Sequence, residues 1–325
     1  MKRIIKSKEI GALLIIIILF GLVGTYNSSF LTINNIFQTI NGSVVYAVVA
    51  IGMSFVLFLG EIDVSVGATL GLAATLTGLM VVEGVNYYLI FITVLALGIV
   101  IGIINGLGVT YLKIPSIIMT LGTNGIIRGM IYVVTGGRWV EGLDVEFKAL
   151  SQVRIGNTIT YIYIFVLVLA LITYLLTKYT LFGKSFKAVG DNEEGAKLIG
   201  LPVKKTKMVA FIASGVGSSI GGILYASRVG FITPTAGSGY EMTAIAACVI
   251  GGISLAGGVG SVWGGVIGAV LMTSISRILV FVGLPSTYDS TITGLMLIVI
   301  VVTTAIVNKR SAERIRLQRL ASRIE

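Results

Sequence analysis

Histidine is absent from this chain of 325 residues, and cysteine occurs once, as Cys248. The lack of imidazole excludes histidine-based metal sites and the Ser-His-Asp and Cys-His forms of catalysis. A single cysteine forms no intrachain disulfide, so we expect Cys248, which lies in an apolar run, to be a small core residue. We therefore expect no catalytic residues, no metal site and no enzymatic activity.

Charged residues are also scarce, at 12%, whereas 55% of the residues are hydrophobic and the mean hydropathy is +1.00. A soluble domain of this size exposes too much surface to hide so many apolar side chains. The 42 glycines and only four prolines fit long helices that pack closely through small residues. We predict an all-α, polytopic membrane protein that forms a single transmembrane domain over 1–325, with membrane lipid around it.

About 20 apolar residues are needed to cross a hydrocarbon core of roughly 30 Å. This rule predicts about ten transmembrane helices, near 10–24, 40–60, 62–82, 87–110, 114–135, 158–178, 208–227, 240–257, 260–283 and 289–307. The segment after the first apolar run lacks a small-residue cleavage pattern, so we interpret that run as an uncleaved first span rather than a signal peptide.

The basic residues lie mostly outside the apolar runs, and the net charge is +10. In a soluble protein this balance would suggest a nucleic-acid partner. Here, placing the N-terminus in the cytoplasm leaves only Arg138, Lys148, Arg154 and Arg228 in outer loops, in agreement with the positive-inside rule. We therefore expect no nucleic-acid partner, and both termini in the cytoplasm. The segment 308–325 is predicted to be a basic amphipathic tail at the inner surface.

Charges within spans cost about 2.5–3.5 kcal/mol each, so each needs an explanation. Asp63 stands between the second and third predicted spans, where it either caps the third helix through backbone N–H groups or lines a solute path. For Arg128, Glu241 and Arg277, a buried ion pair among them is the simplest explanation. For a substrate path we select Asp63, Asn105 and Asn124, although such polar residues often only bridge helices.

Glycines recur every four residues at 98, 102 and 106, and again at 260, 264 and 268. Residues at this spacing share one helix face and allow a second helix to approach closely. The simplest interpretation is helix packing within one subunit. A subunit interface and a solute path are the alternatives.

The most specific feature is the cytoplasmic loop predicted over 178–207. Asn192 can cap a short helix that carries Glu193 and Glu194 in its first turn, and Gly200 and Pro202 can end it. Such firm stops indicate a docking element for a soluble partner, with an unpartnered surface helix as the alternative. The predicted docking residues are Gly190, Asp191, Asn192, Glu193, Glu194, Gly195, Ala196, Lys197, Leu198 and Gly200.

Nucleotide binding by this chain is not expected. Phe182-Gly183-Lys184-Ser185 ends like a phosphate-binding loop, but the first glycine of that motif is replaced by Lys178. Energy from ATP would therefore have to come from a partner protein.

The chain resembles the permease subunits of ATP-binding cassette importers of the ribose, xylose and arabinose type over nearly its whole length. The motifs that carry the resemblance are IDVSVG at 62–67, LKIPS at 112–116, AVGDNE at 188–193, and GYEMTAIAA at 239–247 followed by GGISLAGG at 251–258. TGGRWVEGL at 135–143 and Gly190-Asp191-Asn192 are most similar to the autoinducer-2 and rhamnose permease branch. Asp191, and Glu61 after Gly60, depart from the usual ribose permeases.

The resemblance implies a short coupling helix that sits in a groove of a partner ATPase, which holds ATP and magnesium; this chain would bind no cofactor. It also implies a second permease subunit, identical or paralogous, an extracytoplasmic solute-binding protein, and a location in the bacterial inner membrane. The solute would be a monosaccharide or sugar-like compound moved by alternating access. A stand-alone, ion-coupled secondary transporter is the alternative, since Asp63 and Glu241 are acids within the membrane region.

Overall fold

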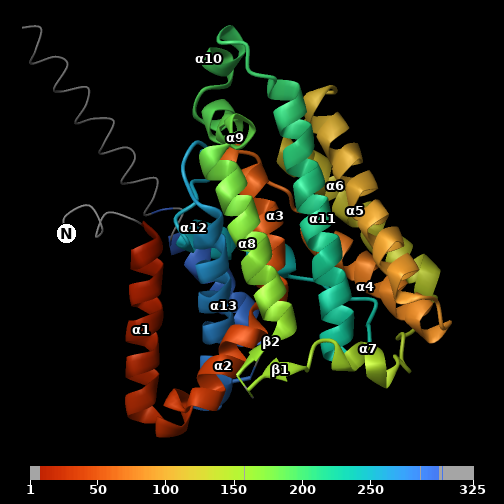
Figure 1. Cartoon of the computed structure of the whole chain (residues 1–325), viewed down its shortest axis with the longest axis vertical. Coiled ribbons are helices and arrows are strands. Elements are labelled where there is room, and N and C mark those ends of the chain that lie inside the picture. The colour runs from red at the N-terminus through yellow and green to blue at the C-terminus, as the bar shows by residue number, and fades with distance from the viewer. Residues whose placement is uncertain (1–7, 157, 286, 300–301, 303–325) are drawn as a thin grey trace, which may run out of the picture.

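The protein was studied through a computed structural model, which describes residues 8–156, 158–285, 287–299 and 302. The fold is almost entirely helical (Figure 1). Its elements are α1 (Lys8–Tyr26), a 3-10 turn (Ser28–Leu31), α2 (Ile33–Gly42), α3 (Val44–Phe58), α4 (Val66–Val82), α5 (Tyr87–Thr110), α6 (Ser116–Thr135), α7 (Val145–Ala149), β1 (Arg154–Ile155), β2 (Ile159–Thr160), α8 (Tyr161–Tyr179), α9 (Leu181–Asp191), α10 (Glu193–Leu198), α11 (Val203–Val229), α12 (Tyr240–Ile250) and α13 (Val262–Val282). A further apolar helix covers Tyr288–Val299.

Within the described residues, α5, α6, α8, α11 and α13 are long and apolar enough to cross a membrane. The bent pair of α2 and α3, which meet at 42°, makes a sixth candidate if it counts as one span. Four shorter apolar helices, Gly11–Tyr26, α4, α12 and Tyr288–Val299, complete the apolar set. Each of the ten predicted spans thus contains an apolar helix, but several of these helices are shorter than the sequence suggested. The predicted tail at 308–325 lies outside the described residues.

Two of the helices are shorter than predicted because the backbone is irregular at one end of each. The predicted spans at 62–82 and 240–257 include irregular backbone, because α4 begins only at Val66 and α12 ends at Ile250. Turns at Gly252, Gly257 and Gly258, all with positive φ, follow α12. Irregular backbone at membrane depth is tolerated only where protein buries it. The first break meets this condition, because Asp63 and Ser65 are each only 1% exposed.

Helix α3 is the centre of the bundle, and nearly all of its residues are buried. Helix α11 lies against α3, α4 and α5 and joins the two sides of the bundle (Figure 1). A Cβ atom on Gly98 or Gly102 of α5 would collide with backbone atoms of Gly215 and Phe211 in α11. The first glycine stripe therefore serves helix packing within the subunit, as its simplest interpretation predicted.

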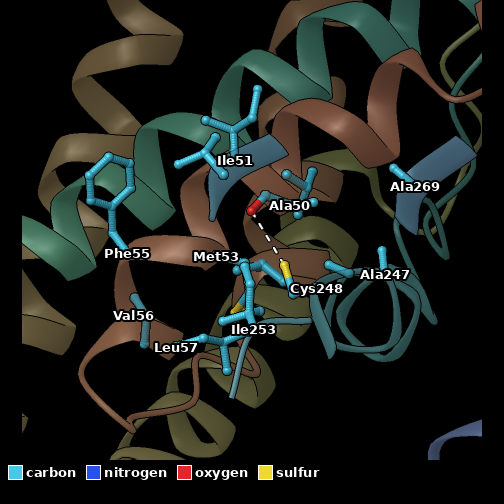
Figure 2. Packing of buried hydrophobic residues seen from close by; sticks show 14 of the residues in the cluster. Ala50, Ile51, Met53, Phe55, Val56, Leu57, Ala247, Cys248, Ile253 and Ala269 are labelled. Carbon is cyan, nitrogen blue, oxygen red and sulfur yellow. Dashed lines mark hydrogen bonds between the residues drawn. The ribbon is translucent and has the colours of Figure 1, made fainter. Parts of the chain in front are cut away.

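The second glycine stripe also packs within the subunit. A Cβ atom on Gly264 would meet the backbone of Gly251, and one on Gly268 would meet Ala247, so α12 and α13 are in backbone contact. Cys248 lies in the same region and is fully buried between α12 and α3 (Figure 2). Its thiol donates a hydrogen bond of 3.4 Å to the carbonyl oxygen of Ala50. The prediction of Cys248 as a small core residue is confirmed.

Candidate functional site: a docking tip and its connection to the core

Helices α9 and α10 stand together at one end of the bundle; α9 lies next to the end of α8, and α10 projects beyond it (Figure 1). The predicted cap is present, because the side-chain oxygen of Asn192 accepts a 2.8 Å hydrogen bond from the backbone N–H of Gly195. Gly200 ends the element with φ +80, and Leu201 N–H closes the turn on the carbonyl of Ala196. The capped helix and its stop were therefore predictable from the sequence.

Helix α9, by contrast, was not predicted. The Thr180 hydroxyl caps it by accepting from the N–H of Gly183, so the stretch that resembles a phosphate-binding loop is the first turn of a helix. Phe186 and Val189 on one face of α9 are buried in the main core. Buried residues at this i, i+3 spacing are the signal that could have revealed an amphipathic helix.

The outer end of α10 exposes large apolar side chains. Leu198 is 89% and Ile199 is 75% exposed, while Ala196 on the opposite face is buried. We call Leu198 and Ile199 the docking tip. Ile199 was not among the predicted docking residues, although it lies between Leu198 and Gly200, both of which were. Two adjacent apolar side chains presented by a capped and anchored helix are suited to contact a partner.

Helix α10, which carries the docking tip and is called the docking helix below, is held to the bundle by an ion-pair network at its base. The ammonium of Lys207, in α11, lies 2.9 Å from Glu193 Oε2 and 2.9 Å from Glu61 Oε1. Lys197 adds pairs within α10, at 3.0 Å to Glu193 and 2.8 Å to Glu194. The hydrogen bond from Lys207 is the main reason that the pKa of Glu193 is lowered from its ordinary value. The network links α10 to α11 and to the break that follows α3.

A second connection is made by backbone atoms. A Cβ atom on Gly190 at the end of α9 would collide with the carbonyl oxygen of Phe58, the last residue of α3. The same carbonyl accepts a 3.0 Å hydrogen bond from the N–H of Gly258. Asp191 lies beside Gly258, close enough to meet a Cβ built there. The α9–α10 unit therefore touches the end of α3 and the turn after α12 directly.

The three predicted substrate-path residues belong to one polar network deeper in the bundle. Asp63 accepts hydrogen bonds from the N–H and hydroxyl of Ser65 and from the hydroxyl of Ser214. Asn105 donates to Ser65 and accepts from Thr123. These bonds join the α3–α4 break to α5, α6 and α11.

Asp63 and Asn105 are almost fully buried, whereas Asn124 is half-buried and donates to the carbonyl oxygen of Val64. Ser65 occupies the cap position of α4 and makes no side-chain cap bond there. Asp63 therefore braces the turn before α4 instead of bonding to the N–H groups of its first turn. Whether the network borders a solute path stays a prediction.

The prediction of a buried ion pair among Arg128, Glu241 and Arg277 is wrong. Within the described residues, Arg128, Glu241 and Arg277 form none of the observed ion pairs. The guanidinium of Arg128 donates to the carbonyl of Ala236, and that of Arg277 donates to the side chain of Gln38. One oxygen of Glu241 accepts from Gly239 N–H, and the other is buried without a partner. Neutral acceptors satisfy these cations because irregular backbone and polar side chains lie within reach.

Comparison with known proteins adds an independent line of support. A family described as "Branched-chain amino acid transport system / permease component" matches residues 35–301. The chain is 38% identical over 302 residues to the "Autoinducer 2 import system permease protein LsrC" of Escherichia coli O9:H4 (strain HS), which covers 93% of this chain and 88% of that relative. It is 41% identical over 303 residues to LsrC of Salmonella paratyphi B (strain ATCC BAA-1250 / SPB7), covering 93% and 87%. No solved structure matches.

The family match and the relatives extend over most of the apolar helices, and they agree with the resemblance that the motifs suggested. They support an importer permease and give no support to the ion-coupled secondary transporter. The chain therefore belongs to the family of membrane permease components of branched-chain amino acid transport systems, in the branch that contains the autoinducer-2 import permeases.

Proposed function

We propose that this permease imports autoinducer-2 or a closely related sugar-like solute, and that a partner ATPase drives it through the docking tip. The observation that carries the docking proposal is the exposure of Leu198 and Ile199 on a capped helix whose base is tied to the core. A groove in the ATPase would cover these two apolar side chains. ATP and magnesium would then be bound by the ATPase, and this chain would bind no cofactor.

The proposed topology has ten spans, with both termini and the docking tip in the cytoplasm. Irregular breaks shorten α4 and α12, and protein around the breaks makes up the missing length, which supports counting both helices as spans. The domain would then be a single permease over 1–325, with the 178–207 loop as its coupling segment and 308–325 as a basic inner tail. A second permease subunit and an extracytoplasmic solute-binding protein complete the importer.

The contacts of α9 and α10 suggest how movement of the ATPase could reach the membrane helices. Closure of the ATPase would move α10, and the pairs from Lys207 to Glu193 and Glu61 would carry that movement to α11 and to the break after α3. Asp63 lies two residues beyond Glu61, and it anchors the start of α4 to Ser214 of α11. We propose that the network of Asp63, Asn105 and Asn124 borders the solute path. Movement of the break between α3 and α4 would then change the shape of that path.

Uptake by proteoliposomes tests the function. Purified permease would be reconstituted with its partner ATPase and solute-binding protein. Accumulation of labelled autoinducer-2, rhamnose, ribose and xylose would then be compared with and without ATP. We expect ATP-dependent accumulation of autoinducer-2 above the three sugars. Accumulation of another solute would overturn the substrate, and accumulation that needs an ion gradient but no ATP would overturn the importer.

The docking proposal has its own test. Replacing Leu198 and Ile199 with aspartate should abolish co-purification of the ATPase with the permease, because the apolar contact is lost. Tyr88→Asp is the matched control, since Tyr88 is 83% exposed at the opposite end of the bundle. Equal ATPase binding by L198D/I199D and by Y88D would contradict the placement of the docking surface.

A further inference from the structure

A long apolar groove opens on the side of the bundle formed by α4, α5 and α6. Its volume is about 430 Å³, and its lining is almost purely apolar. Val100 and Ile104 of α5 form one wall, and Ile118, Ile126 and Met130 of α6 form the other; all five side chains are exposed. From Ile118 to Met130 helix α6 rises about 1.5 Å per residue, which gives the groove a length of roughly 18 Å. One membrane leaflet has a hydrocarbon depth of about 15 Å, so the groove can hold an acyl chain.

The groove leads into a charged pocket of about 400 Å³ on the docking-tip side of the molecule, and Ile114 lines both spaces. Its charged lining consists of Glu61, Lys113, Glu193, Lys197, Lys204 and Lys207. The two glutamates are already paired with Lys207 and Lys197. Lys113 and Lys204 form no ion pair in the described part of the chain, although the ammonium of Lys204 lies 5.0 Å from the centre of the Tyr111 ring. The pocket therefore carries two positive charges that no carboxylate neutralises.

Three further features of the pocket favour an anion. Lys113 has φ +56, the only non-glycine residue with positive φ in the described structure. A strained backbone at an exposed lysine suggests that its side chain is retained for binding. The pocket is also lined by Pro115, the N-cap residue of α6, and by Val203, the first residue of α11; neither of these long helices has a side-chain cap bond. Uncapped helix N-termini attract negative charge. The hydroxyl of Thr110, which lines the same pocket, is buried and has no hydrogen-bond partner among the residues that the structure describes.

We propose that this combined space binds an anionic phospholipid of the membrane leaflet that faces the docking tip. The phosphate lies between Lys113 and Lys204 within reach of the Thr110 hydroxyl, and one acyl chain fills the groove between α5 and α6. A basic pocket joined to an apolar groove at the membrane surface matches the two halves of such a lipid. A second copy of this chain fits less well, because it would bring the same basic face against the same pocket. This lipid site is separate from the proposed import function. It rests on that function only for the orientation of the protein in the membrane.

The site also has a consequence for the docking helix. Lys197 and Lys207, which hold α10, line the pocket together with the proposed phosphate ligands. A bound phosphate would therefore contribute to the charges at the base of the docking helix, and lipid occupancy would stabilise its position.

The test uses purified permease in nanodiscs of neutral phosphatidylcholine with increasing phosphatidylglycerol, and native mass spectrometry counts bound anionic lipid. We expect Lys113→Gln with Lys204→Gln to weaken phosphatidylglycerol binding roughly 10-fold or more, given about 1 kcal/mol per basic residue near a membrane surface. Lys205→Gln is the matched control, because Lys205 is exposed beside Lys204 but does not line the pocket.

A second pair of variants tests the groove. Gly122 lines it and Gly125 does not, and a Cβ atom at either position would meet no other atom within 4 Å, so both positions have room for the start of a side chain. We expect Gly122→Leu to reduce lipid retention several-fold and Gly125→Leu to leave it unchanged. Equal retention by all four variants and the wild type would overturn the proposal. So would a G122L variant that changes the number of permease chains per nanodisc but not the bound lipid, because the groove would then hold a second copy. Neither readout needs the ATPase or the solute, so failure here is separate from failure of the import function.

Discussion

Lys207 and Glu193 form the pair that fixes the docking helix to the bundle: the ammonium nitrogen lies 2.9 Å from Glu193 Oε2, and Lys207 keeps only 14% of its side chain exposed. The same ammonium bonds Glu61, which follows α3. One cation therefore joins α10 and α11 to a residue that lies 146 positions away in the sequence. Its substitution should affect coupling rather than solute recognition, which gives the first prediction.

Glu193→Lys should uncouple the importer, because it places a second ammonium against the half-buried Lys207. Like charges in contact cost several kcal/mol, so we expect ATP-dependent uptake to fall roughly tenfold or more. Glu83→Lys is the matched control. Glu83 is exposed at the end of α4 and takes part in none of the ion pairs of the described residues, so uptake by this variant should stay within about twofold of the wild type. Proteoliposome uptake and ATP hydrolysis measured together check both variants; equal loss in the two would refute the special role of the Lys207 pair.

Gly190→Ala should loosen the contact between α9 and α3, because the added methyl group collides with the carbonyl oxygen of Phe58. Overpacking of this kind costs about 1–3 kcal/mol. A thermal unfolding scan should therefore show a lower Tm for G190A, and ATP hydrolysis should proceed with less uptake. Gly125→Ala on α6 is the control: its Cβ meets nothing within 4 Å, and alanine favours helix by up to about 1 kcal/mol. A Tm for G190A at or above that of G125A would rule out the tight contact.

The pairing of Glu193 also predicts a pH dependence. The pKa of Glu193 is lowered from its ordinary value of 4.5, chiefly by the hydrogen bond from Lys207. The stabilisation is therefore complete above pH 4.5 and is lost as the pH falls through the lowered value. A spin label at Leu198→Cys would report mobility of α10, since the native Cys248 is fully buried.

We expect the spin label to be immobile from pH 7 to 4.5 and mobile at lower pH. In a Glu193→Gln background, which leaves Glu61 in place, it should be mobile throughout. A label whose mobility follows the same pH curve in both backgrounds would show that Glu193 does not hold the helix.

The local chemistry of the docking helix was predictable, and its anchoring was not. Asn192, the two acids after it and Gly200 are short-range signals, and each takes the predicted part in α10. The bond from Lys207 to Glu61, by contrast, joins residues 146 positions apart. No local pattern encodes such a contact, because it depends on how α3 and α11 pack. The interpretation of membrane charges failed for the same reason, since Arg128 finds a backbone carbonyl far along the chain.

Hydropathy predicted where apolar helices lie but not where they break. The runs at 62–82 and 240–257 are mostly apolar through residues that form turns, and hydropathy does not register that burial in protein lets irregular backbone lie at membrane depth. Only the polar marker at Asp63 and the glycines at 257 and 258 indicated irregular backbone. The sequence therefore gives the number of apolar segments more reliably than their helical length.

The last prediction distinguishes two roles for the buried polar residues near Asp63: stabilising the break between α3 and α4, and lining the solute path. Asn105→Ala should remove two buried hydrogen bonds, one to Ser65 and one from Thr123, each worth about 0.5–1.5 kcal/mol. Tm should therefore fall while KM for the solute changes little. Asn124→Ala removes a half-buried amide that bonds one backbone carbonyl; if Asn124 borders the solute path, it should raise KM with little change in Tm.

Thr173→Ala is the control for both, because the Thr173 hydroxyl bonds only to carbonyls of its own helix. Thermal unfolding and concentration-dependent uptake, measured on the three variants, decide the matter. A drop in Tm for N124A as large as that for N105A, with KM unchanged in both, would mean that the whole network is structural and that the solute passes elsewhere. A raised KM for N124A alone would place the solute beside Val64, at the point where the α3–α4 break meets α6.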